Sequence, residues 1–178
     1  MRDFGRSRSR SPEGLTLFIL PFVGQTFLED VLPNMLILNQ IIEAEIAIRA
    51  VESYPFEGCG LLFGTVQNED KIVRAIFPVP NVWEVEEERR VRFRIDDMDM
   101  VNAELEADEQ GLDVIGIFHS HPDHPPVASL RDLAWATWTG YSYLITEVRG
   151  GEAFESKSWQ LRSDRSGFNE EEIEYSDI

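Results

Sequence analysis

Residues 117–132 read IFHSHPDHPPVASLRD and hold all 3 histidines of the 178-residue chain, at positions 119, 121 and 124. The apolar run at 112–118 that leads into them is typical of a strand buried on both faces of a sheet. Residues two apart on an extended segment share a face, so His119 and His121 can point at one ion. The spacing therefore predicts a pair of imidazoles at the end of a buried strand.

Ser129 and Asp132 follow at the spacing of a helix start. Taken alone, this pair indicates a capping box, in which each residue bonds the backbone of the other. Next to the histidines, Asp132 would also complete a set of two imidazoles and one carboxylate, which leaves one zinc position open for water. The two interpretations are compatible, because a helix start holds both side chains rigidly. His124 is an alternative third ligand, and we favour for it a place at the substrate rim.

A second stretch, YPFEGCGLLFG at 54–64, places Glu57 directly before a strand pattern interrupted by glycines. Glycines at 58, 60 and 64 are unusual inside a strand and indicate close approach of backbone. An acid at the mouth of a strand is more often solvated than catalytic. Glu57 by itself is therefore only a candidate for the base that a metal hydrolase needs.

The remaining sequence alternates strand and helix patterns. We predict strands at 35–38, 59–66, 71–79, 91–96, 112–118, 141–148 and 156–161, and helices at 40–53, 98–111 and about 129–139. Asn39 caps the first helix, Pro55 stops it, and Gly111 ends the second. Trp135 and Trp138 are predicted to lie in the core. Hairpins mixed with helices favour an α/β (α+β) fold, with a curved mixed β-sheet flanked by helices.

Three segments are expected along the chain. Residues 1–34 form an N-terminal extension that begins with arginines and carries an apolar run too short to span a bilayer, so no membrane partner is expected. A charged start before an apolar stretch also resembles a signal peptide, but no small-residue cleavage site follows. Residues 35–163 form the domain, and the acidic tail at 164–178 is predicted to be solvated and mobile.

Composition limits the partners and the compartment. The chain has 16 basic and 33 acidic residues, a net charge of −17, which argues against a nucleic-acid partner. The single cysteine, Cys59, excludes an internal disulfide and fits a reducing compartment, so we predict a cytoplasmic protein. Cys59 lies two residues after Glu57, and strand alternation directs it toward the same site or its rim. The simpler interpretation is a small buried packing residue.

The two stretches together resemble the JAMM (MPN) metalloprotease family. Its motif is H-x-H-P, six residues and S-x-x-D, with an upstream glutamate in a segment like P-x-E-x-C-G-L-L-x-G. Here His119, His121, Ser129 and Asp132 match that spacing without gaps. The resemblance extends over about 35–162, and it implies a core similar to that of the cytidine deaminases.

The resemblance also implies roles for these residues. His119, His121 and Asp132 would bind Zn²⁺. Glu57 would be the general base on the zinc-bound water, and Ser129 would donate a hydrogen bond to the developing oxyanion.

The same resemblance implies a substrate class. Family members hydrolyse the bond after the C-terminal glycine of ubiquitin-like proteins, and the short prokaryotic members resemble peptidases of sulfur carriers. The expected partner is therefore a ubiquitin-fold carrier that ends in Gly-Gly, with its tail added as a strand against the arginine-rich edge at 88–95. The alternative is a non-catalytic interaction scaffold, since the family also contains metal-free members. Whether the chain forms a homo-oligomer, and which linkage it cuts, are left open.

Overall fold

A computed structural model describes residues 35–176, and the predicted extension at 1–34 lies outside the described residues. The elements in chain order are β1 (Met35–Asn39), α1 (Gln40–Ser53), β2 (Cys59–Gln67), β3 (Asp70–Val79), the 3₁₀ helix η1 (Glu86–Arg90), α2 (Asp97–Glu109), β4 (Asp113–Pro122), α3 (Leu130–Trp135), β5 (Ser142–Arg149), β6 (Glu152–Leu161) and β7 (Phe168–Ser176). No helix of the described part is long and apolar enough to cross a membrane.

The strands form one mixed sheet in the order β1-β3-β2-β4-β5-β6-β7, and pairing of β7 with β1 closes it into a barrel. The β1–β3, β1–β7 and β4–β5 pairs are parallel, and the other pairs are antiparallel. The predicted mixed sheet with few helices is therefore confirmed. Closure into a barrel is an addition that the sequence patterns did not indicate.

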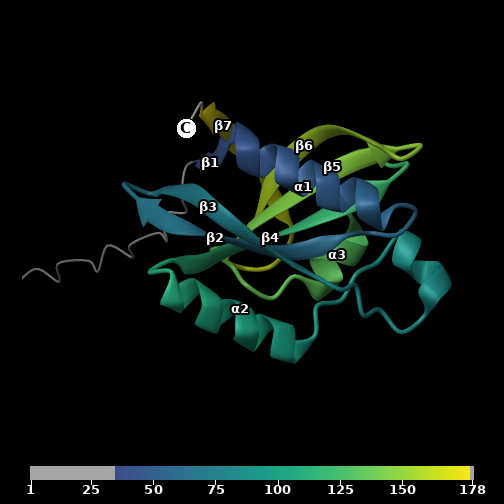
Figure 1. Ribbon diagram of the computed structural model, residues 1–178, viewed down its shortest axis with the longest axis horizontal. Helices are drawn as coiled ribbons and strands as arrows, with labels where there is room; N and C mark the ends of the chain where they lie inside the picture. Colours follow the sequence, from purple (N-terminus) through teal and green to yellow (C-terminus); the bar gives the residue numbers. More distant parts are fainter. Residues whose placement is uncertain (1–34, 177–178) are drawn as a thin grey trace, which may run out of the picture.

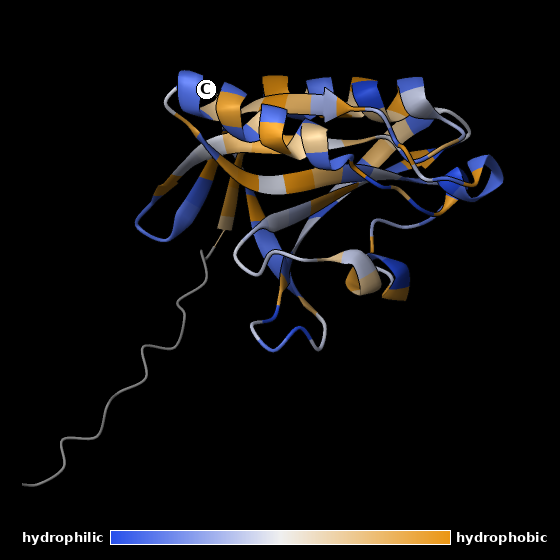
Figure 2. Ribbon diagram, turned by 90° about the horizontal axis from the view of Figure 1, so that it is seen from below, coloured by the Kyte–Doolittle hydropathy of each residue, from blue (hydrophilic) through white to orange (hydrophobic). Residues whose placement is uncertain are grey.

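α1 and α2 lie on opposite sides of the strands (Figure 1), and each packs on its own apolar cluster. Ile46 of α1 packs with residues such as Leu62 and Phe118, whereas Ala103 and Ala107 of α2 pack on the other side. Figure 2 shows the hydrophobic residues gathered along the strands of the sheet. β4 runs between the two clusters, which explains why its sequence is apolar without alternation.

Local signals predicted most element ends correctly. Asn39 caps α1 by accepting a hydrogen bond from the amide of Ile41 at 2.6 Å. The β2–β3 hairpin turns at Asn68 and Glu69, whose φ values of 50° and 76° are those of a two-residue hairpin turn. Gly64 confirms the expected close approach, because an added Cβ would lie 2.1 Å from the carbonyl oxygen of Ile72.

The prediction for the end of the chain was wrong. Residues 168–176 form β7, which pairs with both β6 and β1 and completes the barrel. The sequence pattern did not indicate a strand here, because the residue of β7 that is buried, Glu171, is acidic and not apolar. Its carboxylate lies 3.5 Å from the ammonium of Lys71, which is 1% exposed, and Gln160 donates to it. A buried charge is tolerated only when paired in this way.

Two further predictions were wrong. Residues 91–96 join no sheet, and the helix after Ser129 ends at Trp135 instead of continuing to 139. The helix stops early because the Tyr143 hydroxyl bonds both the amide and the carbonyl of Trp138, which holds that residue outside a helix. Trp135 and Trp138 are consequently 56% and 38% exposed, and they do not lie in the core.

Candidate metal centre and active site

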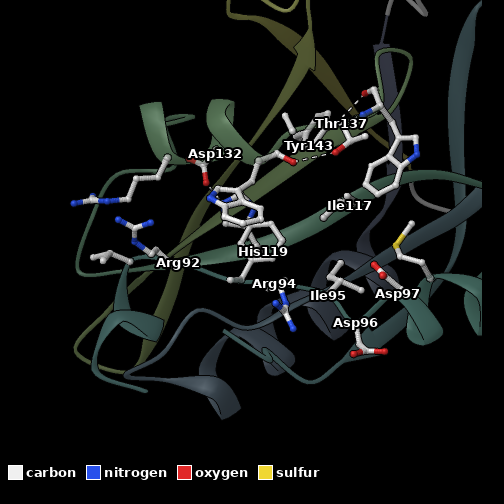
Figure 3. Close-up of a pocket in the computed structure, with 17 residues that line it drawn as sticks. Arg92, Arg94, Ile95, Asp96, Asp97, Ile117, His119, Asp132, Thr137 and Tyr143 are labelled. Atoms are coloured by element: carbon white, nitrogen blue, oxygen red, sulfur yellow. Dashed lines mark hydrogen bonds and ion pairs between the residues drawn. The ribbon is translucent and has the colours of Figure 1, made fainter. Parts of the chain in front are cut away.

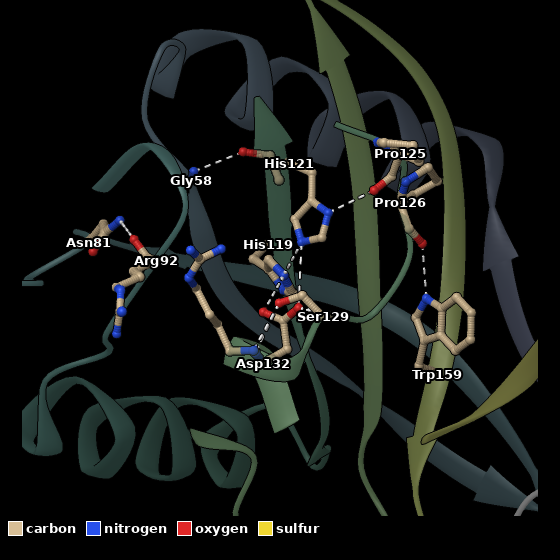
Figure 4. A network of polar contacts seen from close by, with 12 residues as sticks. Gly58, Asn81, Arg92, His119, His121, Pro125, Pro126, Ser129, Asp132 and Trp159 are labelled. Atoms are coloured by element: carbon tan, nitrogen blue, oxygen red, sulfur yellow. Dashed lines mark hydrogen bonds and ion pairs between the residues drawn. The ribbon is translucent and has the colours of Figure 1, made fainter. Parts of the chain in front are cut away.

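The end of β4 brings the two histidines together as predicted. β4 lies between β2 and β5, and this central position buries the side chains of His119 and His121. Their Nε2 atoms are 3.1 Å apart, which shows that both rings point to the same side of the strand (Figure 4). Phe93 stacks on the His119 ring, with the ring centroids 4.5 Å apart.

The third member comes from α3. Asp132 Oδ1 lies 3.3 Å from His119 Nε2, and Oδ2 lies 3.7 Å from His121 Nε2. The predicted capping box is also present: the Ser129 hydroxyl accepts from the Asp132 amide at 3.2 Å, and the Ser129 amide donates to Asp132 Oδ2 at 2.6 Å. One carboxylate therefore both caps the helix and faces the imidazoles.

The geometry fits a tetrahedral ion. Ligand bonds of about 2.0–2.1 Å to zinc place two ligand atoms of a tetrahedron roughly 3.4 Å apart. The two Nε2 atoms are 3.1 Å apart and His119 Nε2 lies 3.3 Å from Asp132 Oδ1, both close to that value, whereas the 3.7 Å contact of His121 Nε2 is with the other oxygen, Oδ2. His119, His121 and Asp132 are a group whose ligand atoms all lie within 4.8 Å of one another. Two imidazoles and a carboxylate also leave a fourth position for water or substrate.

The protonation states suit ligands. Burial lowers the pKa of His119, with partial compensation from Asp132, so its imidazole is neutral at pH 7. Burial would raise the pKa of Asp132, but His119, His121 and Ser129 together lower it below its usual range. The His121 Nδ1 atom donates to the carbonyl of Pro125 at 2.8 Å, which leaves Nε2 free to bind an ion.

Glu57 lies beside this group, directly before β2. It is 4% exposed, and its Oε2 atom has no hydrogen-bond partner among the described residues. Burial and the nearby Asp132 carboxylate raise the pKa of Glu57 to about 9. A buried, unpartnered carboxyl next to a metal-capable cluster is the arrangement that a bound cation and a water molecule would satisfy.

Backbone bonds fix Glu57 relative to the histidines. Ser120, between the two histidines, donates its amide to the carbonyl of Gly58 at 2.9 Å. Its hydroxyl accepts from the amide of Gly58, also at 2.9 Å (Figure 4). Gly58 must be glycine, because an added Cβ would lie 2.5 Å from the Ser53 hydroxyl.

The two residues expected at the rim lie in different surroundings. His124 is exposed, in the loop after β4, and is not part of the metal-capable group. Cys59 is 3% exposed at the start of β2, with its thiol 3.8 Å from the carbonyl of Val79. Burial, with a contribution from Glu57, raises the pKa of the Cys59 thiol to about 12, so the thiolate does not form at neutral pH.

We expect Cys59→Ala to leave kcat near the wild-type value, because a neutral buried thiol packs but does not react. The lost sulfur should lower the free energy of unfolding by about 1 kcal/mol, as small core truncations do. Steady-state kinetics check kcat, and denaturant unfolding of the same preparation checks the free energy of unfolding. A large loss of kcat in a folded variant would assign Cys59 a part in the site.

A pocket of about 430 Å³ opens beside the cluster and includes His119 and Asp132 in its lining (Figure 3). Segment 91–95 lines one side, and another side is lined by α3, with Trp135 at its end, and by Trp138 just after it. The exposure of these tryptophans is therefore explained by a concave surface next to the metal-capable group. Arg92, Arg94 and Arg131 also line it, in a chain whose net charge is −17.

Sequence reasoning missed three residues of this region. Phe93 was included in the strand predicted for 91–96, and Ser120 occupied the variable position between the histidines. Asn81 lies in a loop, and its importance is visible only from the hydrogen bonds that its side chain makes in the folded protein. A polar residue between two histidines is a signal that could have drawn attention to Ser120, whereas Phe93 meets His119 only in the folded structure.

Comparisons with known proteins identify the family of the chain. The family model described as prokaryotic homologs of the JAB domain matches residues 39–162. The chain is 38% identical over 96 residues to a desampylase of Haloferax volcanii, covering 54% of this chain and 66% of that protein, just under two thirds. It is 32% identical over 126 residues to a desampylase of Pyrococcus furiosus, covering 71% and 81% respectively.

A solved structure shows the same fold. The solution structure of a protein from Desulfitobacterium hafniense superimposes with a TM-score of 0.71 at 28% identity, covering 81% of this chain and 94% of that one. The family match extends over most of the chain and includes Glu57, both histidines of β4, Ser129 and Asp132. The chain belongs to the prokaryotic homologs of the JAB domain, within the JAMM (MPN) family of hydrolases.

Proposed function

We propose that the protein is a zinc-dependent peptidase or isopeptidase that cuts after the C-terminal glycine of a ubiquitin-fold carrier protein. The observation that carries the proposal is the buried Glu57 carboxyl, whose Oε2 atom has no hydrogen-bond partner among the described residues, beside His119, His121 and Asp132. The two desampylases and the family match support this reaction class. A cytoplasmic location is part of the proposal, consistent with one buried, unpaired cysteine.

The residues have separate tasks in this proposal. His119, His121 and Asp132 would hold zinc, which when bound lowers the pKa of a coordinated water and polarises the scissile carbonyl. The charge of a bound cation would lower the raised pKa of Glu57, so that its carboxylate can take a proton from the attacking water and later deliver it to the leaving amine. The Ser129 hydroxyl accepts backbone bonds with its oxygen, so its hydrogen is available to the oxyanion.

The carrier tail would lie along the pocket against residues 91–95. The backbone of Arg94 is turned toward residues 81–82, whereas the amide and carbonyl of Phe93 form no hydrogen bond within the described part of the chain. Such an open edge can accept an extended tail as an added strand. Of the arginine-rich edge expected at 88–95, residues 88–90 belong to η1, so only the remainder can serve this purpose.

Cleavage of defined carriers tests this function. The substrates are a ubiquitin-fold carrier extended beyond Gly-Gly by one amino acid and the same carrier joined to a lysine side chain, each followed by mass spectrometry. We expect release of the carrier ending in Gly-Gly from at least one of them, and full inhibition by a zinc chelator with recovery on adding zinc. Binding of both without cleavage, in the zinc-loaded protein, would favour the scaffold alternative.

A further inference from the structure

Asn81 connects the two halves of the site through one side chain. It follows β3, and its Nδ2 atom donates to the carbonyl of Glu57 at 3.0 Å and to the carbonyl of Arg92 at 2.9 Å. Its Oδ1 atom accepts from the amide of Trp83 at 3.0 Å and from the amide of Arg94 at 3.3 Å. The carboxamide thus uses both of its donors and both lone pairs of its acceptor.

These four bonds replace a strand pairing that the region lacks. Residues 91–95 belong to no sheet, and the Val82 amide adds a backbone bond to the Arg94 carbonyl. Two side-chain contacts also reach this loop, because Arg94 pairs with Glu84 and Arg92 lies over the Trp83 ring. Figure 4 shows Asn81 bonded to the backbone of Arg92 on the side away from the histidines. Packing of Phe93 and Ile95 on the core also holds this wall, but Asn81 is the side chain that bonds its backbone at both Arg92 and Arg94.

The Glu57 backbone depends on the same side chain. The Glu57 amide donates to the carbonyl of Arg89 at 2.7 Å, and its carbonyl accepts from Asn81. The next peptide is fixed by both bonds to Ser120. Each backbone polar group of Glu57 and Gly58 is thus bonded, and Asn81 supplies the one bond that links Glu57 to the pocket wall.

We infer that Asn81 is a positioning residue for hydrolysis. It fixes the position of Glu57 relative to the metal ligands and to the pocket wall at 91–95, which receives the substrate tail. Phe93 extends this connection, because it lies between two residues bonded by Asn81 and stacks on His119. Only a side chain with two donors and an acceptor at this reach can bond two carbonyls and two amides. The inference rests on the proposed function of Glu57 as the base.

The test compares Asn81→Ala and Asn81→Asp with Asn169→Ala as a matched control. Asn169 lies on β7, where its side chain accepts from Arg162 at 2.9 Å, away from the site. We expect both Asn81 variants to keep about one zinc per chain and to lower kcat by about 10–100-fold, since a displacement near 1 Å can cost about 10²-fold. Asn81→Asp loses both donated bonds, because a carboxylate cannot donate to the carbonyl oxygens of Glu57 and Arg92. Asn169→Ala should leave kcat unchanged.

A double variant separates positioning from mere stability. In a Glu57→Gln background, Asn81→Ala should lower kcat by less than about 3-fold further, because Asn81 acts on kcat through Glu57. Equal kcat losses in both backgrounds, or a variant with lowered thermal stability and wild-type kcat, would overturn the inference.

Hydrogen exchange of the zinc-loaded protein gives an answer that does not depend on turnover. Asn81→Ala should accelerate exchange at the amides of Trp83 and Arg94, which lose their acceptor, and at Glu57, while β4 stays protected. Unchanged exchange at these amides would show that Asn81 does not hold the segment. If wild type cleaves no carrier, the proposed function fails, and the exchange result alone decides whether Asn81 joins Glu57 to the pocket wall.

Discussion

Replacing Glu57 with glutamine is expected to lower kcat by roughly 10²–10⁴-fold while the protein keeps its fold and about one zinc per chain. The glutamine has the same shape but cannot take a proton from water or return one to the leaving amine. Because Glu57 is not a member of the ligand group, the substitution leaves the three ligand atoms in place. The loss should appear in kcat, since the proton transfer belongs to the transition state.

Steady-state kinetics on the carrier substrates, with zinc measured on the same samples, check this expectation. Glu109→Gln is a suitable control, because Glu109 is an exposed acid at the end of α2. Binding of the carrier should survive in Glu57→Gln, which separates an enzyme from a scaffold. Wild-type turnover in Glu57→Gln would remove Glu57 from the mechanism, and loss of zinc would make it a ligand.

Replacing Asp132 with alanine is expected to abolish stoichiometric zinc binding. Loss of an outer hydrogen-bond partner typically weakens metal binding 10–100-fold, and loss of a direct ligand should exceed about 100-fold. The reason lies in the geometry: without the carboxylate, the ligand group keeps only two imidazoles, and no ligand balances the charge of a dication in a buried site. Activity should fall together with the zinc content.

Two companion variants distinguish ligation from the capping function of Asp132. Asp132→Asn can still accept the bond from the Ser129 amide, so it should keep α3 intact while it loses affinity for zinc. His124→Ala should keep full zinc, because His124 lies outside the ligand group. Elemental analysis and a competing chelator give the affinities. Undiminished zinc in Asp132→Ala with loss in His124→Ala would reverse the ligand assignment.

Local patterns determined much of this protein in advance. A period of two residues placed His119 and His121 on one face, and a three-residue spacing placed Ser129 and Asp132 in one helix turn. The Asn39 cap and the two-residue turn after β2 likewise depend on neighbours in sequence. These features could be predicted because their physical causes act within a few residues.

What failed in the sequence-based prediction depended on residues far apart in the chain. β7 is acidic, and its buried position, Glu171, is stabilised by an ion pair with Lys71, which is 100 positions earlier, and by a hydrogen bond from Gln160. The end of α3 depends on the hydroxyl of Tyr143, and the exposure of the tryptophans depends on the pocket that they line. No local preference records such contacts.

The sequence by itself determined which groups can bind a metal and move a proton, because residue type and short spacing fix the chemistry of imidazoles and carboxylates. Tertiary structure alone decided that Glu57, 62 positions before His119, meets them in a buried place where its pKa rises to about 9. It also decided that segment 91–95 stays out of the sheet. Asn81 bonds the Arg92 carbonyl and the Arg94 amide, which a neighbouring strand would otherwise bond. Burial and long-range hydrogen bonds arise only when the chain folds.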